Sequence, residues 1–235
     1  MNMLNEKCAF IRVRQVQNYL ERRDSSLSFL IFLKIFDIIY IENEKENDKM
    51  KIENVKQYLE LYHKCDERTE EETEALIQYN KDLCKRYPFL IPWNRWSGKL
   101  ATTDEEGYWP GTPESKPDYD WTYTELDQMM DGWRIAFGEQ MCEELREELM
   151  RTGDLENFRI VQLKEKYGTM RLYDAGTSSD SKVSEIISKY EKMSEDICLH
   201  CGRPVKWETC GWITFICDEC AKTYERNGIR LVPIE

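Results

Sequence analysis

CLHCGRPVKWETCGWITFICDEC, residues 198–220, contains two C-x-x-C pairs with fifteen residues between them. Each pair presents two sulfur atoms from one tight turn, and four such sulfurs suit the tetrahedral coordination of zinc. The spacing therefore predicts one structural zinc ion in this stretch. Four thiolates leave no coordination position open for a substrate, so the pattern disfavours a catalytic metal. The predicted ligands are Cys198, Cys201, Cys217 and Cys220.

The residues between the two pairs are expected to form a short β-hairpin, because WITFIC at 212–217 has the composition of a strand. Residues 198–235 are therefore predicted to form a zinc-ribbon-like module. Gly202 follows the first pair and is expected to take the positive φ that suits such a turn. Cys210 is interpreted as a small buried residue outside the ligand set and His200 as an exposed residue, with either as an alternative ligand.

The other cysteines do not follow a paired spacing. They occupy scattered positions in predicted helices and are interpreted as core or partly buried thiols: Cys8, Cys65, Cys84 and Cys142. The two C-x-x-C pairs favour thiolates bound to a metal in a reducing compartment over disulfides in a secreted chain.

Residues 1–49 are an N-terminal extension of doubtful status. Its apolar run LSFLIFLKIFDIIYI, residues 27–41, is interrupted by Lys34 and Asp37 and is shorter than the roughly 20 residues of a membrane span. No small-residue cleavage site follows the run, so we expect neither a signal peptide nor a membrane partner. The extension differs in charge and pattern from the amphipathic stretch that begins at Met50. Met1 and Met50 are therefore alternative start sites of translation.

Residues 50–197 are predicted to form a mainly helical body. Apolar residues recur at helical spacing within 50–86 on both sides of an acidic break, which predicts a helical hairpin. A further helix is expected to begin at Thr122, with Glu125 as its reciprocal cap, and to run to Gly153 as one kinked helix or two short ones.

The residues that precede the cysteines complete this body. A β-hairpin is predicted at 158–174, with its turn at Tyr167 and Gly168. An amphipathic helix predicted at 183–197 leads directly into Cys198. Together the elements predict an α+β fold, with a mainly helical body, one β-hairpin and a C-terminal zinc ribbon.

The charge distribution limits the partners. The net charge is −12, and within 50–156 the acidic residues outnumber the basic ones about two to one. Such a surface repels nucleic acid and anionic membranes. We interpret it as a solvated surface that keeps the protein soluble; the alternative is a decoy surface that occupies a nucleic-acid-binding protein.

Two surfaces are candidates for binding a partner. The irregular segment 87–121 is rich in proline and contains four tryptophans that suit a protein partner: Trp93, Trp96, Trp109 and Trp121. The tip of the 158–174 hairpin carries three basic side chains beside Tyr167 that suit phosphate groups: Lys164, Lys166 and Arg171. The charge of the body favours the protein partner, and the hairpin leaves nucleic acid as the alternative.

The sequence favours a protein without catalytic activity. It has only two histidines, His63 on a predicted helix and His200 within the first cysteine pair. No phosphate-binding glycine loop, nucleophile elbow or H-E-x-x-H motif is present. The enzymatic alternative is a hydrolase that uses the carboxylates near Asp118, Asp120 and Asp127.

Four further stretches support a resemblance: RYPFLIPWN from Arg86, GWRIAFGEQMCEEL from Gly132, VQLKEKYGTMRLY from Val161 and ICLHCG from Ile197. Over residues 86–220 the chain resembles a group of uncharacterised bacterial and phage proteins that combine a K-E-K-[FY]-G-x-[LM]-R-x-Y hairpin with a paired-cysteine tail. The resemblance implies the cytoplasm of a prokaryotic or phage-infected cell and supplies no activity. We therefore expect a non-enzymatic, zinc-binding interaction or regulatory protein, with a phage or mobile element as the interpreted origin.

Overall fold

The computed structural model describes residues 50–93, 95, 100 and 120–234. The chain divides into a unit of residues 1–50 and a compact unit of residues 51–235, and only the second is described below. The predictions for the N-terminal extension and for four single residues therefore lie outside the described residues: Cys8, Trp96, Trp109 and Asp118. Within the described ranges, no helix is long and apolar enough to cross a membrane.

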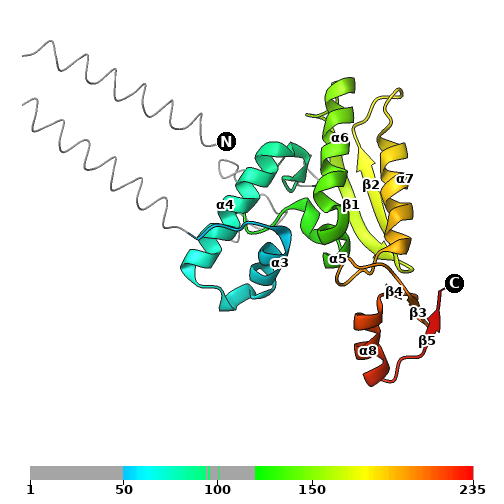
Figure 1. Ribbon diagram of the computed structural model, residues 1–235. Helices are drawn as coiled ribbons and strands as arrows, with labels where there is room; N and C mark the ends of the chain where they lie inside the picture. Colours follow the sequence, from blue (N-terminus) through cyan, green and yellow to red (C-terminus); the bar gives the residue numbers. More distant parts are fainter. Residues whose placement is uncertain (1–49, 94, 96–99, 101–119, 235) are drawn as a thin grey trace, which may run out of the picture. The chain divides into compact units, whose positions relative to one another are not determined.

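The predicted helical hairpin is confirmed by two helices, α3 (Val55–His63) and α4 (Glu70–Arg86), shown in Figure 1. The side chain of Asn54 accepts hydrogen bonds from two backbone amides of the first turn of α3. Thr69 and Glu72 form a reciprocal capping box at the start of α4. A short 3₁₀ helix (Cys65–Glu67) joins the two, and another (Pro88–Leu90) follows α4.

The helix predicted from Thr122 begins elsewhere. Thr124, not Thr122, caps a 3₁₀ helix (Glu125–Gln128), and Asp127 rather than Glu125 completes its capping box. The chain is extended at Met129 and Met130 and then enters α5 (Asp131–Trp133), a π-helical turn (Arg134–Gly138) and α6 (Glu139–Thr152). The prediction of the helix start was therefore wrong, because two overlapping capping patterns lie in the same stretch.

The predicted β-hairpin consists of β1 (Arg159–Lys166) and β2 (Thr169–Ala175), joined by Tyr167 and Gly168. Side chains satisfy backbone groups on both of its open edges, where an unpaired strand would otherwise expose donors and acceptors. The indole of Trp93 donates to the carbonyl of Ile160 at 2.8 Å, and the amide of Met170 donates to Ser194 Oγ at 2.9 Å. The hairpin is therefore fixed by its surroundings on both sides.

One face of the hairpin packs in the main core with α6 and α7 (Val183–Met193) (Figure 1). Leu163 on β1 lies opposite Leu172 on β2, and both are buried. The helices contribute the other large side chains of this core, which include Trp133, Met141, Leu145, Leu149, Ile187 and Tyr190. This packing confirms the mainly helical body with one β-hairpin.

The C-terminal residues form a small sheet and a helix. The strands are β3 (Trp207–Thr209), β4 (Phe215–Ile216) and β5 (Leu231–Pro233), in the order β4-β3-β5. The strand expected over 212–217 is only two residues long, because Cys217 already caps the helix α8 (Asp218–Arg226). The α+β class is thus confirmed, and α8 and β5 were not predicted.

The start of this C-terminal part is held directly by the body. The backbone amide of Gly132 donates to the carbonyl of Leu199 at 2.8 Å, and the indole of Trp133 donates to the carbonyl of Ile197 at 3.0 Å. The side chain of Leu199 packs in the main core. The predicted boundary at residue 198 thus falls within one compact unit.

Candidate metal centre

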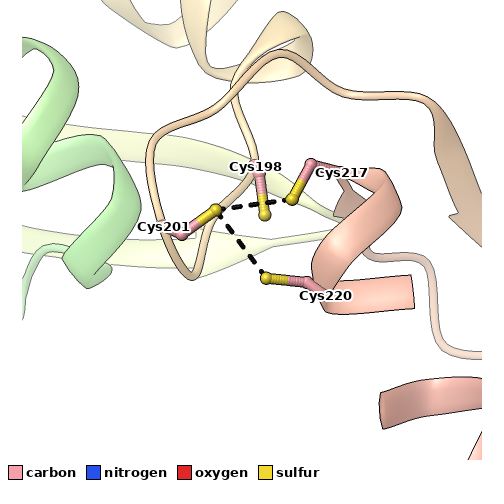
Figure 2. A group of neighbouring side chains, drawn as sticks. All are labelled: Cys198, Cys201, Cys217 and Cys220. Carbon is pink, nitrogen blue, oxygen red and sulfur yellow. Dashed lines mark hydrogen bonds between the residues drawn. The ribbon is translucent and has the colours of Figure 1, made fainter. Parts of the chain in front are cut away.

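The four predicted cysteine ligands lie together, with every sulfur within 4.8 Å of the others. Figure 2 shows their side chains pointing toward one another, two from a loop and two from the start of α8. The sulfurs of Cys201 and Cys217 are 3.4 Å apart, and those of Cys201 and Cys220 are 3.7 Å apart. Both distances far exceed the roughly 2 Å of a disulfide bond.

These separations match a tetrahedral metal site. Zinc–sulfur bonds of about 2.3 Å place the sulfurs of a regular tetrahedron roughly 3.8 Å apart. The measured separations lie close to that value. The four cysteines therefore have the ligand type, the number and the spacing to hold one metal ion.

Backbone geometry shapes the first cysteine pair. The amide of Gly202 donates to the carbonyl of Cys198 at 3.0 Å, and the amide of Cys198 donates to the carbonyl of Arg203 at 2.7 Å. Gly202 has a φ of +78°, which confirms the positive φ predicted for it. A β-carbon at Gly202 would also lie 2.8 Å from the carbonyl oxygen of Gly132, so the turn approaches the body too closely for a side chain.

Helix α8 shapes the second pair. Cys217 is the N-cap, and Cys220 lies in the first turn, where backbone amides are free of intrahelical partners. Burial acts to raise the pKa of Cys217, but the amides of Cys220 and Glu219 and the neighbouring thiols lower that pKa to about 7. The helix start thus favours a thiolate at Cys217.

The four sulfurs require a positive charge to ionise together. Burial and the neighbouring sulfurs raise the pKa of Cys220, and burial also raises the pKa of Cys201. Like charges at such short range disfavour full ionisation, whereas a divalent cation favours it. The electrostatics of the centre therefore fit a bound metal.

The two alternative ligands lie outside this cluster. His200 is exposed, as predicted, and its Nε2 is 2.7 Å from the hydroxyl of Tyr224. Cys210 is exposed rather than buried, so that prediction was wrong. The reason is that β3 ends at Thr209 and Cys210 begins the loop, where its amide donates to the carbonyl of Arg230 at 2.8 Å.

The remaining cysteines and histidine within the described residues fit structural positions. Cys84 and Cys142 are buried, as predicted, and burial raises the pKa of the Cys84 thiol to about 12. Cys65 is exposed, contrary to the prediction, because it lies in the short connection between α3 and α4. His63 is exposed, with Nε2 2.8 Å from a carboxylate oxygen of Asp131.

The tryptophans proposed to bind a protein are partly buried where they are described. Trp93 is anchored to β1 by its indole, and Trp121 packs against the main core. A different tryptophan is highly exposed: the side chain of Trp212, between β3 and β4, is 75% exposed. Sequence reasoning missed Trp212 because it was assigned to a strand of the small hairpin.

The carboxylates proposed for a hydrolase have separate surroundings. Asp120 is exposed and accepts hydrogen bonds from Thr122, whereas the side chain of Asp127 is buried. Asp127 forms an ion pair with the guanidinium of Arg134, which also lies 4.2 Å from the ring centroid of Tyr58. Burial acts to lower the pKa of Arg134, but the charge of Asp127 outweighs it and raises that pKa. These contacts give Asp127 a structural role in joining α3 to the π-helical turn.

Glu125, which the sequence predicted as a helix-capping residue, is a further buried carboxyl. Its side chain is 1% exposed, and one of its oxygens lies 3.6 Å from a nitrogen of Arg95. Burial raises its pKa to about 7, against the lowering effect of Arg95 and of the backbone amide of Trp93.

Glu125→Gln is expected to change how stability depends on pH. A folded-state pKa above the unfolded value means that the folded protein holds a proton which the unfolded chain has released. Stability should therefore fall from about pH 4.5 to about pH 7, by roughly 3 kcal/mol, and then level off. The variant should lack this slope and be more stable than the parent protein at pH 8. Urea unfolding of both proteins between pH 5 and pH 8 measures this pH dependence of the free energy of unfolding. An equal slope in the variant and the parent protein would contradict the raised pKa of Glu125.

Comparison with protein-family models, with curated proteins and with solved structures found no match to this chain.

Proposed function

We propose that the chain is a non-enzymatic interaction protein whose C-terminal part is organised by one structural zinc ion. The convergence of four cysteine sulfurs carries this proposal. A site with four sulfur ligands is chemically closed, so the ion serves as a structural centre rather than a Lewis acid for a substrate. Four thiolates suit zinc or iron–sulfur chemistry, and the two C-x-x-C turns around a single point suit zinc.

The module differs in one respect from the ribbon expected from the sequence. Its second cysteine pair lies at the start of α8. The order of elements is therefore the turn at residues 198–202, called the knuckle below, then a β-hairpin and a helix. The ion would therefore join the knuckle beside Gly132 to the first turn of α8. Within this proposal, zinc fixes the hairpin between the two pairs and presents its exposed residues to a partner.

The setting follows from the resemblance described above. We place the protein in the cytoplasm of a prokaryotic or phage-infected cell, with a partner in that cell. A protein was the partner favoured by the tryptophan-rich segment, but Trp93 and Trp121 serve the fold of the body. The exposed aromatic residues of the described chain lie elsewhere, at the β1–β2 hairpin and the β3–β4 loop.

The test is capture of the natural partner by metal-loaded and metal-free protein. Affinity-tagged protein from the native host is divided, one half is treated with a chelator, and bound proteins and nucleic acids are identified by mass spectrometry and sequencing. We expect a specific partner on the loaded protein and its loss after chelation, because the module loses its order. A partner retained equally by the metal-free protein would contradict a role for zinc in binding.

Cys210→Ser is expected to retain one zinc ion per chain. Cys210 is exposed, and its sulfur is not a member of the four-sulfur cluster. Elemental analysis of the purified variant is the measurement, with Cys65→Ser as a control for loss of another exposed thiol. Loss of the metal from the Cys210 variant alone would show that the ligand set is misassigned.

A further inference from the structure

The outward face of the β1–β2 hairpin gathers basic and aromatic side chains. Lys164 lies directly opposite Arg171 in the register, and side chains two residues apart on one strand share a face. Lys166 and Tyr173 therefore lie on the same face as this pair. The opposite face is apolar and packs in the core, so the basic side chains are kept on the outside.

The three cations of this face lie between two tyrosine rings, one at the turn and one farther along β2. The ammonium of Lys164 lies 5.3 Å from the ring centroid of Tyr173, and that of Lys166 lies 5.5 Å from the ring centroid of Tyr167. The rings are open to solvent, because Tyr173 is 46% exposed and Tyr167 is 62% exposed. From the turn to Tyr173 the face extends roughly 16 Å at the usual rise of a strand.

Tyr167 occupies a position that its backbone does not favour. It has a φ of +55° and is followed by Gly168 at +77°, as in a tight hairpin turn that asparagine and glycine normally fill. Left-handed backbone is costly for a tyrosine. Its ring is exposed at the tip, so the side chain contributes little burial to offset that strain. Such strain at an exposed residue points to a role for the side chain itself.

The tip of this hairpin meets the metal-organised module. A β-carbon at Gly168 would lie 2.8 Å from a ring carbon of Phe215 and 3.3 Å from Cγ2 of Ile213. Phe215 lies on β4, two residues before Cys217, and Ile213 directly follows the exposed Trp212. The metal module thus supports the turn that carries Tyr167, and the exposed Trp212 is the chain neighbour of a residue in that contact.

We infer that these six side chains form a binding surface for single-stranded nucleic acid: Lys164, Lys166, Tyr167, Arg171, Tyr173 and Trp212. Exposed rings provide stacking platforms for unpaired bases, and the cations between them contact the phosphates. A length of roughly 16 Å accommodates only a few extended nucleotides. The acidic surface of the body would repel the phosphates of a longer or thicker ligand and confine contact to this face.

Charge complementarity favours nucleic acid over a protein partner here. The three cations have no carboxylate within ion-pair distance among the described residues. Lys164 donates to the side-chain oxygen of Gln162 and Arg171 to the carbonyl of Met170, both uncharged acceptors, so the three positive charges are left for an external anion. Bases stack on aromatic rings without regard to sequence, so we expect little sequence preference.

This inference rests on the proposed function, since the turn packs on the metal module. The test uses full-length, zinc-loaded protein and fluorescein-labelled oligothymidylate and oligouridylate of about twelve nucleotides. Fluorescence anisotropy at about 50 mM salt should detect binding of both. The logarithm of the association constant should fall with the logarithm of salt concentration with a slope near −2, as for about three phosphate contacts on a single strand.

Two matched pairs of variants locate the surface. The triple variant K164Q/K166Q/R171Q should weaken binding at least about tenfold and flatten the salt slope. The variant K56Q/K81Q/K85Q removes the same charge from exposed positions on α3 and α4 and should bind as the parent protein does. Tyr167→Ala should weaken binding about tenfold, whereas Tyr167→Phe keeps the ring and should retain it.

The outcomes separate the two proposals. No oligonucleotide binding by protein that contains one zinc ion overturns this inference and leaves the proposed function standing. Equal weakening by the two triple variants also overturns it, because the effect would then be one of net charge alone. A protein partner captured by parent protein and K164Q/K166Q/R171Q alike, without oligonucleotide binding, would overturn the inference and show that the partner binds elsewhere. A C-terminal module that folds without any metal contradicts the proposed function itself.

Discussion

Cys217→Ser is expected to abolish metal binding and to unfold the C-terminal module. Structural zinc sites contribute about 10–16 kcal/mol of binding free energy to folding, and three thiolates hold the ion far less tightly than four. The sheet β4-β3-β5 has short strands and only a small buried cluster, composed chiefly of Cys198, Ile216, Cys217 and Ala221. Such a cluster is too small to hold the module without the ion.

The body should remain folded in this variant but lose part of its stability. Its main core has its own large side chains, and most of them come from elements before residue 198. Release of the knuckle would nevertheless withdraw Leu199 from that core and free the amide of Gly132. We expect a loss of about 2–3 kcal/mol in the body, close to the cost of emptying one buried leucine site.

Limited proteolysis with mass spectrometry and hydrogen exchange distinguish these effects. Cleavage and rapid exchange should appear from about residue 198 onward, while α6 and α7 stay protected. Cys65→Ser provides the control, because it removes an exposed thiol outside the cluster. Full protection of β3 and α8 in Cys217→Ser would show that the module folds without its metal.

Gly132→Ala is expected to destabilise the protein strongly. Its β-carbon would lie 2.0 Å from the carbonyl oxygen of Cys198 and 2.7 Å from the amide nitrogen of Gly202. Both contacts are with backbone, so no side-chain rotation relieves them. The knuckle must therefore move away from α5, and we expect a destabilisation of about 3 kcal/mol or more.

The matched control is Gly138→Ala, six residues along the same helical stretch. Its β-carbon would lie 3.3 Å from Cγ of Arg134 and 3.6 Å from Sδ of Met129, so these side chains need to shift by only a few tenths of an ångström. Arg134 is held by its ion pair with Asp127, but alanine is a better helix former than glycine by about 1 kcal/mol, so we expect a stability within about 1 kcal/mol of that of the parent protein. Urea unfolding and zinc affinity measure both variants. Similar stabilities for the two would contradict the close docking of the knuckle on Gly132.

Local patterns in the sequence predicted much of this fold. The apolar spacing in Val55–His63, Glu70–Arg86 and Val183–Met193 follows the helical repeat, and the structure has helices there. The hairpin turn at Tyr167 and Gly168 was likewise predicted from alternating arms around a turn signal. These elements are set by short-range periodicity and turn chemistry, which a single sequence displays.

Features that depend on distant contacts were not predicted. Thr122 and Thr124 both begin an acceptable capping pattern, and the ion pair of Asp127 with Arg134 favours the second. Helix α8 was missed because its start overlaps the second cysteine pair, which was interpreted only as a ligand motif. The contact between Gly132 and the knuckle joins residues far apart in the chain, and no local pattern encodes it.

The candidate site likewise has features that the sequence predicted and features that it did not. The spacing of the cysteine pairs predicted a four-sulfur cluster, and the structure brings those sulfurs together. Spacing could not show that Trp212 is exposed or that Gly168 packs against Phe215. Those facts come from the packing of the β1–β2 hairpin against the C-terminal module, and they support the nucleic-acid surface proposed above.

The most direct test of the central claim is the metal content and coordination of the purified protein. Elemental analysis combined with X-ray absorption at the zinc edge reports both the stoichiometry and the ligands. We predict one zinc ion per chain, coordinated by four sulfur atoms at about 2.3 Å. Protein whose C-terminal module is folded, but which holds no metal and has all its cysteine thiols titratable, would contradict the claim.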